Sequence, residues 1–122
     1  PFKMIQRIST IEPDEKQRAA ASGIEFSPDG NHLFVTNAGI NTVIIYDVDK
    51  ETGVLTPLFH CKTSGDYPKA VAVMPDNKHF IVLSHETDEI FIYNMNYEDC
   101  YFLQDSRPIK IEQPNCIFIH KL

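Results

Sequence analysis

Short stretches rich in apolar residues recur along this sequence, and each one ends at a cluster of turn-forming residues. Runs of four to eight residues rich in Val, Ile, Phe and Tyr are typical of β-strands. No segment keeps an apolar period of 3.6 residues, and residues 12–21 are read as either a short helical turn or a loop. The pattern predicts strands at residues 24–26, 32–36, 42–48, 55–62, 71–73, 79–83, 89–95 and 100–104.

The last four predicted strands repeat the first four at a constant spacing of 47 residues. The turn at residues 27–30 falls on residues 74–77, and the run at 42–46 falls on 89–93. A third copy begins near Gln113, at a spacing of 46 residues. Repeats of about 40–50 residues that hold four short strands are typical of β-propeller blades.

We therefore predict an all-β fold made of β-propeller blades. Two complete four-stranded antiparallel blades are expected, with one flanking strand on each side, at residues 5–10 and 115–120. The expected division is the end of a preceding blade with its loop at 1–21, blades at 22–63 and 64–111, and the first strand of a following blade at 112–122.

The strand order predicts where a ligand would bind. Neighbouring strands of a blade alternate in direction. The loop that follows the second strand of a blade and the loop that leads into its first strand therefore lie at the same end of the blade. These loops, at residues 37–41, 64–69 and 84–88, are polar and differ between the copies. The turns at the other end share a repeated Pro-Asp pair, and we expect them to have a structural role. Variable loops on a rigid scaffold commonly carry function.

Composition narrows the classes of function. The chain has 122 residues, 43% of them hydrophobic, and a net charge of −6, which argues against a nucleic-acid partner. Its three cysteines fit no zinc pattern, no disulfide is expected, and reduced thiols agree with a cytoplasmic protein. Because the chain starts at Pro1, it is read as a fragment or a processed chain. It shows neither a signal peptide nor a membrane-spanning run, so no membrane partner is expected.

The sequence resembles the lactonase family of seven-bladed β-propellers, whose name-giving activity is hydrolysis of 6-phosphogluconolactone. The resemblance rests on residues 21–30, 33–37, 42–46, 52–55, 67–69 and 112–119. It implies that this chain is the C-terminal third of a propeller that needs on the order of 300 residues.

Several positions depart from the pattern of that family. It commonly carries Glu at Gly23, Arg at Ala38, Arg at Lys69 and Asn at Ser84. The resemblance implies that the missing acidic and basic groups serve hydrolysis and phosphate binding. Among these positions only Lys69 keeps a cation, as a point charge rather than a bidentate fork.

Four residues at the predicted ligand end are candidates for substrate binding: Asn37, Lys69, His85 and Asn115. His85 could also act as a general acid–base group, and the alternative for each of the four is a solvated or backbone-bonded loop residue. No catalytic residue is assigned. His60 and His120 have no partners at ligand spacing, so neither a metal nor a cofactor is expected.

Two functions follow as hypotheses. The parent protein hydrolyses a sugar lactone, or it is a non-catalytic propeller that binds a ligand or a protein. In either case the chain is expected to self-associate or to belong to a longer chain, because two blades cannot close a ring.

Overall fold

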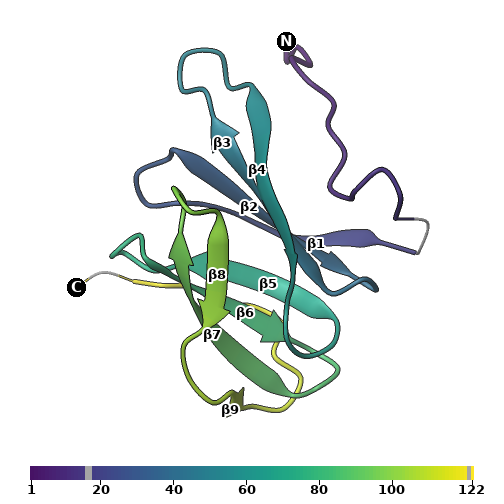
Figure 1. The fold of residues 1–122 in the computed structure, drawn as a ribbon, viewed down its shortest axis with the longest axis vertical. Helices are drawn as coiled ribbons and strands as arrows, with labels where there is room; N and C mark the ends of the chain where they lie inside the picture. Colours follow the sequence, from purple (N-terminus) through teal and green to yellow (C-terminus); the bar gives the residue numbers. More distant parts are fainter. Residues whose placement is uncertain (16–17, 121) are drawn as a thin grey trace.

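The computed structural model of the chain describes residues 1–15, 18–120 and 122, and within these ranges it holds strands and no helix (Figure 1). The all-β prediction is therefore confirmed. The strands are β1 (Ala20–Phe26), β2 (His32–Ala38), β3 (Thr42–Val48), β4 (Leu55–Lys62), β5 (Pro68–Val73), β6 (His79–Ser84), β7 (Glu89–Asn96), β8 (Tyr101–Gln104) and β9 (Ile109–Lys110).

The strands form two antiparallel sheets, which are the two predicted blades. The first has the order β1-β2-β3-β4, and the second has the order β5-β6-β7-β8. Their registers repeat with the sequence: Ile24 pairs with Val35 in the first sheet, and Val71 pairs with Val82 in the second. The repeat of 47 residues is thus a repeat of hydrogen-bonded partners.

The outermost strand of the second sheet is divided, which the sequence pattern did not predict. β8 pairs with the last residues of β7, whereas β9 pairs with its first two residues, Glu89 and Ile90. The interruption between β8 and β9 includes Pro108, which has no N–H to donate to a ladder. β9 holds only two residues, too few to give a periodic signal.

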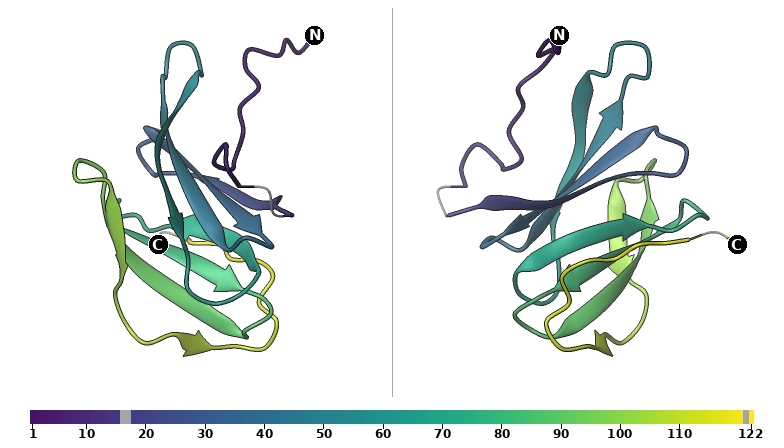
Figure 2. Two further views of the ribbon diagram at one scale, coloured as in Figure 1. Left: turned by 45° about the vertical axis from the view of Figure 1, so that its right-hand side comes forward. Right: turned by 180° about the vertical axis from the view of Figure 1, so that it is seen from behind.

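The core lies between the two blades, which pack face to face with β1 beside β5 (Figure 2). Phe34, Val43 and Ile45 of the first blade are fully buried against the second blade. Phe80 of the second blade stacks on Tyr93 with 4.9 Å between ring centroids, and Phe102 meets both rings edge-on. Burial of large apolar side chains stabilises such a fold by roughly 1.5–3 kcal/mol each.

The two flanking segments do not form strands, which corrects that part of the prediction. Residues 5–10 and 115–120 pair with no strand in the part of the chain that the structure describes. Residues 117–119 instead run beside β5 and line a shallow pocket together with Ala72 and Val73 (Figure 2).

The N-terminal segment packs on the outer face of the first blade. The side-chain amide of Gln6 exchanges two hydrogen bonds with the backbone of Leu55, at 2.7 and 2.8 Å. Tyr46 Oη donates to the carbonyl of Ser9 at 2.7 Å, and Ile8 packs against the apolar cluster beneath. The segment therefore lies where a preceding blade was expected, although it forms no ladder.

Candidate functional site

The innermost strand of each blade, β1 in the first and β5 in the second, contains a β-bulge near its start. The register slips by one residue around Ser22 in β1 and around Lys69 in β5. The two bulged residues are equivalent in the repeat, 47 residues apart. A bulge re-aims a side chain out of the regular pleat, and bulges are common next to active sites.

Lys69 lies in a cluster with Tyr67 and His85, which we call the Tyr67 cluster. The Nζ atom of Lys69 is 5.8 Å from the centroid of the Tyr67 ring, within the range of a cation–π contact. The His85 ring lies 6.4 Å from the Tyr67 ring, centroid to centroid, at an angle of 58°. The backbone N–H of His85 donates to the Tyr67 carbonyl at 3.0 Å. The aromatic ring is therefore flanked by a cation and an imidazole.

Tyr67 adopts a left-handed backbone conformation with φ at 58°. For a residue with a side chain this conformation costs roughly 1–2 kcal/mol. Two hydrogen bonds from Asn41 of the first blade hold it: Asn41 Oδ1 accepts the N–H of Tyr67 at 2.9 Å, and Asn41 Nδ2 donates to Asp66 Oδ1 at 2.7 Å. The loop between β4 and β5 is thus braced by the first blade.

The same loop is also fixed from within the second blade. Tyr93 Oη accepts the N–H of Ser64 at 2.7 Å, and Ser84 Oγ donates to the Ser64 carbonyl at 3.2 Å. Gly65 has φ at 77°, and a Cβ atom there would lie 2.6 Å from Ser84 Oγ. Only glycine fits this position. The Tyr67 cluster is therefore attached to a loop that both blades hold in place.

His85 is oriented by the segment that follows the second blade. Its Nδ1 lies 3.3 Å from the carbonyl oxygen of Pro114. Because a carbonyl oxygen only accepts, this contact favours the tautomer with the proton on Nδ1 and a free lone pair on Nε2. Nε2 is 4.0 Å from Glu86 Oε1, and the side chain of His85 is 17% exposed.

Asn115 directly follows Pro114, so the structure brings it to the same end of the blade as His85. Its Nδ2 donates to the Gln113 carbonyl at 2.9 Å, and its side chain is exposed. In the repeat, Asn115 is equivalent to Lys69 at the spacing of 46 residues. Lys69, His85 and Asn115 therefore lie at the same end of the second blade.

Asn37 has a different environment from the other three candidates. It is fully buried, and its Oδ1 accepts from Thr10 Oγ1 at 2.9 Å. Its Nδ2 donates to the Thr10 carbonyl at 2.7 Å and to Thr42 Oγ1 at 3.3 Å. These bonds tie the end of β2 to the N-terminal segment.

Two of the positions that depart from the family pattern, Gly23 and Ala38, are closed. A Cβ atom on Gly23 would lie 2.8 Å from Thr36 Oγ1 and 3.0 Å from Ala70 Cα. Ala38 is 1% exposed. A longer side chain at Gly23 needs a shift of the β1 or β5 backbone, so this chain has little room for the missing acid.

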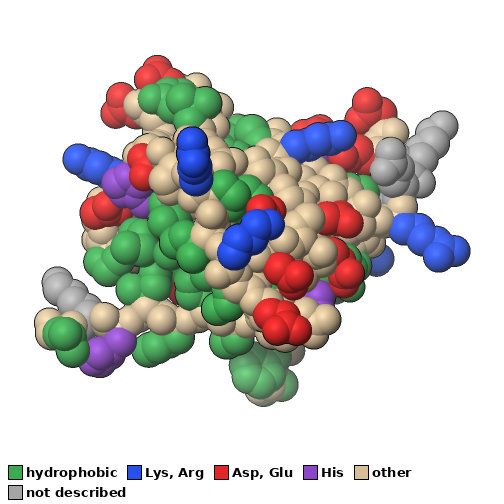
Figure 3. Space-filling view, turned by 90° about the horizontal axis from the view of Figure 1, so that it is seen from below, with side chains coloured by type: hydrophobic (Ala, Val, Ile, Leu, Met, Phe, Trp, Pro, Cys, Tyr) green, Lys and Arg blue, Asp and Glu red, His purple; other side chains and the backbone are tan. Residues whose placement is uncertain are grey.

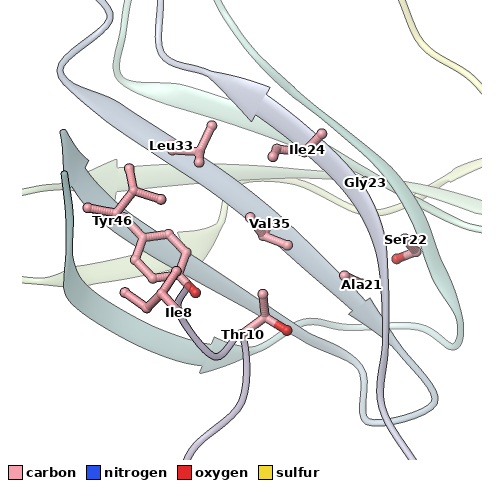
Figure 4. Close-up of a pocket in the computed structure, with 10 residues that line it drawn as sticks. Ile8, Thr10, Ala21, Ser22, Gly23, Ile24, Leu33, Val35 and Tyr46 are labelled. Carbon is pink, nitrogen blue, oxygen red and sulfur yellow. The ribbon is translucent and has the colours of Figure 1, made fainter. Parts of the chain in front are cut away.

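An apolar groove of 340 Å³ lies elsewhere, between the N-terminal segment and the first blade (Figure 4). Its lining includes Ile8, Ile24, Leu33, Val35 and Tyr46 (Figure 4). Burial raises the pKa of Tyr46 above its ordinary value, so the groove holds no group that titrates near neutral pH. Acid–base chemistry is therefore not assigned to it.

The three cysteines all lie in the described part of the chain and are unpaired. Burial raises the pKa of the Cys61 thiol. Among the described residues, no three His, Cys, Asp or Glu side chains are grouped to hold a metal ion. The described ranges contain no helix of the length and hydropathy that crossing a membrane requires.

Sequence reasoning named Lys69 and His85 and did not single out Tyr67. The signal that could have found it is the repeat itself. Position 67 aligns with Ala20 at the spacing of 47 residues, and a change from alanine to tyrosine beside a lysine is a marked local difference.

Comparison with known families agrees with the fold. A family model described as Lactonase, 7-bladed beta-propeller, matches residues 1–119. The chain therefore belongs to this family of seven-bladed β-propellers, as the resemblance predicted.

Individual relatives are similar at low identity. The 6-phosphogluconolactonase of Bacillus subtilis is 22% identical over 122 residues, which are 99% of this chain and 35% of that protein. Among solved structures, a protein from Bacteroides fragilis matches with a TM-score of 0.79 and 26% identity, over 92% of this chain and 31% of that one. The periplasmic gluconolactonase of Pseudomonas aeruginosa matches with a TM-score of 0.80 and 19% identity, over 87% and 30%. The chain thus spans about a third of the length of these proteins.

Proposed function

We propose that the protein containing this chain hydrolyses a sugar lactone at the Tyr67 cluster. The observation that carries the proposal is the contact of His85 Nδ1 with the Pro114 carbonyl, because a proton on Nδ1 places the lone pair of the neutral imidazole on Nε2. Lys69 supplies a cation at the same place, and Asn115 an amide oxygen that can accept from a sugar hydroxyl. Family membership supports the class of substrate.

The proposed reaction assigns one step to each group. His85 Nε2 takes a proton from water, and the water oxygen forms a bond to the carbonyl carbon of the lactone. The ammonium of Lys69 stabilises the negative charge that develops on the carbonyl oxygen. The bond from this carbon to the ring oxygen then breaks, and the imidazolium returns its proton to that oxygen, which gives an open hydroxy acid.

The finer assignment is 6-phosphogluconolactone, with blades outside this chain binding the phosphate while Lys69 faces the lactone carbonyl. The net charge of −6 supports a small-molecule substrate rather than a nucleic acid. Three unpaired cysteines support a reducing compartment such as the cytoplasm.

The test compares variants of the complete natural protein that contains this chain. His85→Gln removes the base, and we expect its rate of hydrolysis of 6-phosphogluconolactone to fall by about 100-fold, at the lower end of general-base effects. His79→Gln at the opposite end of β6 is the matched control and should retain the rate. Acid release is followed at constant pH, with spontaneous hydrolysis subtracted. Equal rates for both variants would reject His85 as the base.

A non-catalytic binding propeller remains the second candidate, and the closed position at Gly23 favours it. Under this alternative the protein binds 6-phosphogluconate at equilibrium, as measured by calorimetry, and does not accelerate lactone hydrolysis. The hydrolase proposal requires both binding and turnover.

A further inference from the structure

The two blades differ at three equivalent positions around the Tyr67 cluster. Ala20, Ser22 and Ala38 of the first blade correspond to Tyr67, Lys69 and His85 of the second, each at a spacing of 47 residues. Since the strands and the bulge repeat, the fold itself accepts small residues at all three positions.

Two of these small residues, Ser22 and Ala38, are used in packing, whereas Ala20 is exposed. Ser22 Oγ donates to the Pro68 carbonyl at 2.5 Å and lies 3.1 Å from Thr36 Oγ1. Ala38 is buried at 1% exposure. Tyr67 is 38% exposed, and its equivalent Ala20 is exposed as well, so packing does not explain a large ring at this position.

The backbone of Tyr67 gives a second, independent observation. A left-handed conformation favours Gly or Asn, and a bulky residue remains there only where its surroundings impose the conformation. The Asn41 side chain, from the other blade, imposes it through the N–H of Tyr67. The ring is thereby held in a fixed direction next to Lys69 and His85.

We infer that Tyr67 is a specificity-determining residue whose ring stacks on the C–H face of a sugar lactone or sugar acid. The face of an aromatic ring carries partial negative charge and attracts both the Lys69 ammonium and polarised C–H groups. A phosphorylated or carboxylated sugar presents the two complementary groups, an anion for Lys69 and a C–H face for Tyr67. The inference rests on the proposed function and names the part of the substrate that this side chain selects.

The experiment uses ring-deleting variants of the complete natural protein that keep the backbone conformation. Tyr67→Gly and Tyr67→Asn remove the ring at a position where both residues accept positive φ. Tyr67→Phe keeps the ring and is the matched control. Calorimetry measures binding of 6-phosphogluconate, gluconate and inorganic phosphate, and thermal melting verifies that each variant folds.

We expect Tyr67→Gly and Tyr67→Asn to weaken 6-phosphogluconate and gluconate about 5- to 10-fold, and Tyr67→Phe to stay within about 2-fold. Inorganic phosphate, which has no C–H face, should be unaffected by loss of the ring and weakened by Lys69→Ala. Because a stacking contact is made before and during reaction, loss of the ring should raise KM and leave kcat unchanged.

The outcomes separate this inference from the proposed function. Unchanged sugar-acid binding in both ring-deleting variants would overturn the role of Tyr67, even if the protein hydrolyses lactones. If binding depends on the ring but the protein shows no turnover, the hydrolase proposal is rejected and the stacking role of Tyr67 is supported. Failure of the unmodified protein to bind either sugar acid would overturn both.

Discussion

The imidazole of His32 stacks face to face on the ring of Tyr97, with 3.7 Å between the ring centroids and 4° between the planes. The two residues come from different blades. Tyr97 Oη also donates to Asn77 Oδ1 at 3.0 Å, and Asn77 Nδ2 donates to Asp29 Oδ2 at 2.8 Å. The turns at this end of the blades therefore join the blades as well as reversing the chain.

This stack gives a prediction on stability. Tyr97→Phe removes one hydrogen bond and should lower the free energy of unfolding by about 1 kcal/mol. Tyr97→Ala also removes the ring from its contacts with His32 and Phe34 and should cost about 3 kcal/mol. Urea denaturation measures both, and an equal effect of the two substitutions would show that the ring itself contributes nothing.

Equivalent histidines in the two blades should titrate in opposite directions. Burial lowers the pKa of His32 below its ordinary 6.5, and the charges of Asp47 and Asp29 only partly oppose this. The hydrogen bond with Asp76 raises the pKa of His79 above 6.5. A pH titration of the imidazole resonances by NMR measures both. Coincident titrations at 6.5 would contradict the prediction.

The opposite shifts have opposite effects on stability. Below about pH 6.5 the unfolded chain protonates position 32 while the folded His32 stays neutral, so this residue destabilises the fold as the pH falls. His79 contributes stability that is present below pH 6.5 and is lost as the pH rises through its folded pKa. Between pH 7.5 and pH 5, His32→Gln should reduce the loss of stability on acidification, and His79→Gln should increase it.

Gly65 and Gly30 provide a matched pair of backbone tests. Both have positive φ, but a Cβ atom on Gly65 would lie 2.5 Å from the Phe91 ring, whereas one on Gly30 would lie 3.8 Å from its nearest neighbour, Lys50. Gly30→Ala should cost about 1 kcal/mol from backbone strain alone. Gly65→Ala should cost about 2 kcal/mol more, because overpacking adds to strain. Similar melting temperatures would refute the clash at Gly65.

The sequence was sufficient to predict the blades and not their contacts. The spacing of 47 residues identified the eight blade strands because a repeated strand keeps its register and its turns. It could not show that His32 is stacked and His79 is not, since Tyr97 lies 65 residues from His32. The sequence also could not predict the hydrogen-bond partner of Asn37, because Thr10 belongs to a segment outside the repeat.

Asn37→Ala should release the N-terminal segment. The substitution leaves the Thr10 hydroxyl and carbonyl without the partners they have in the folded chain and should cost about 2 kcal/mol. Hydrogen exchange of residues 5–10 should become faster than in the unmodified chain. Asn115→Ala removes an exposed amide and is the control, expected within about 0.5 kcal/mol. Unchanged exchange in Asn37→Ala would mean that other contacts hold the segment.

The exposed outer faces of the blades predict how the chain behaves in solution. Ile24 and Phe26 of β1 are 67% and 56% exposed, whereas their equivalents in β5, Val71 and Val73, are 5% and 7% exposed. The difference arises because the first blade covers β5. Figure 3 shows hydrophobic side chains gathered on the face that lies at the bottom of Figure 1, beside the second sheet.

The outer face of the second blade is exposed as well. Phe34, Val43 and Ile45 are fully buried between the blades, while their equivalents Ile81, Ile90 and Ile92 are only half-buried. Exposed apolar patches on one chain usually mark an interface. Each side of this two-blade unit therefore shows the residues that a neighbouring blade would cover.

We predict that the 122-residue chain does not persist as a monomer on its own and pairs with copies of itself through these faces. Ile24→Lys combined with Phe26→Lys should reduce the association, because each fully covered side chain contributes roughly 1.5–3 kcal/mol. Glu25→Lys, between them on the same strand and pointing to the opposite face, is the matched control and should leave association unchanged. Size-exclusion chromatography with light scattering measures the mass. A monodisperse monomer at high micromolar concentration that melts cooperatively would show that two blades are sufficient.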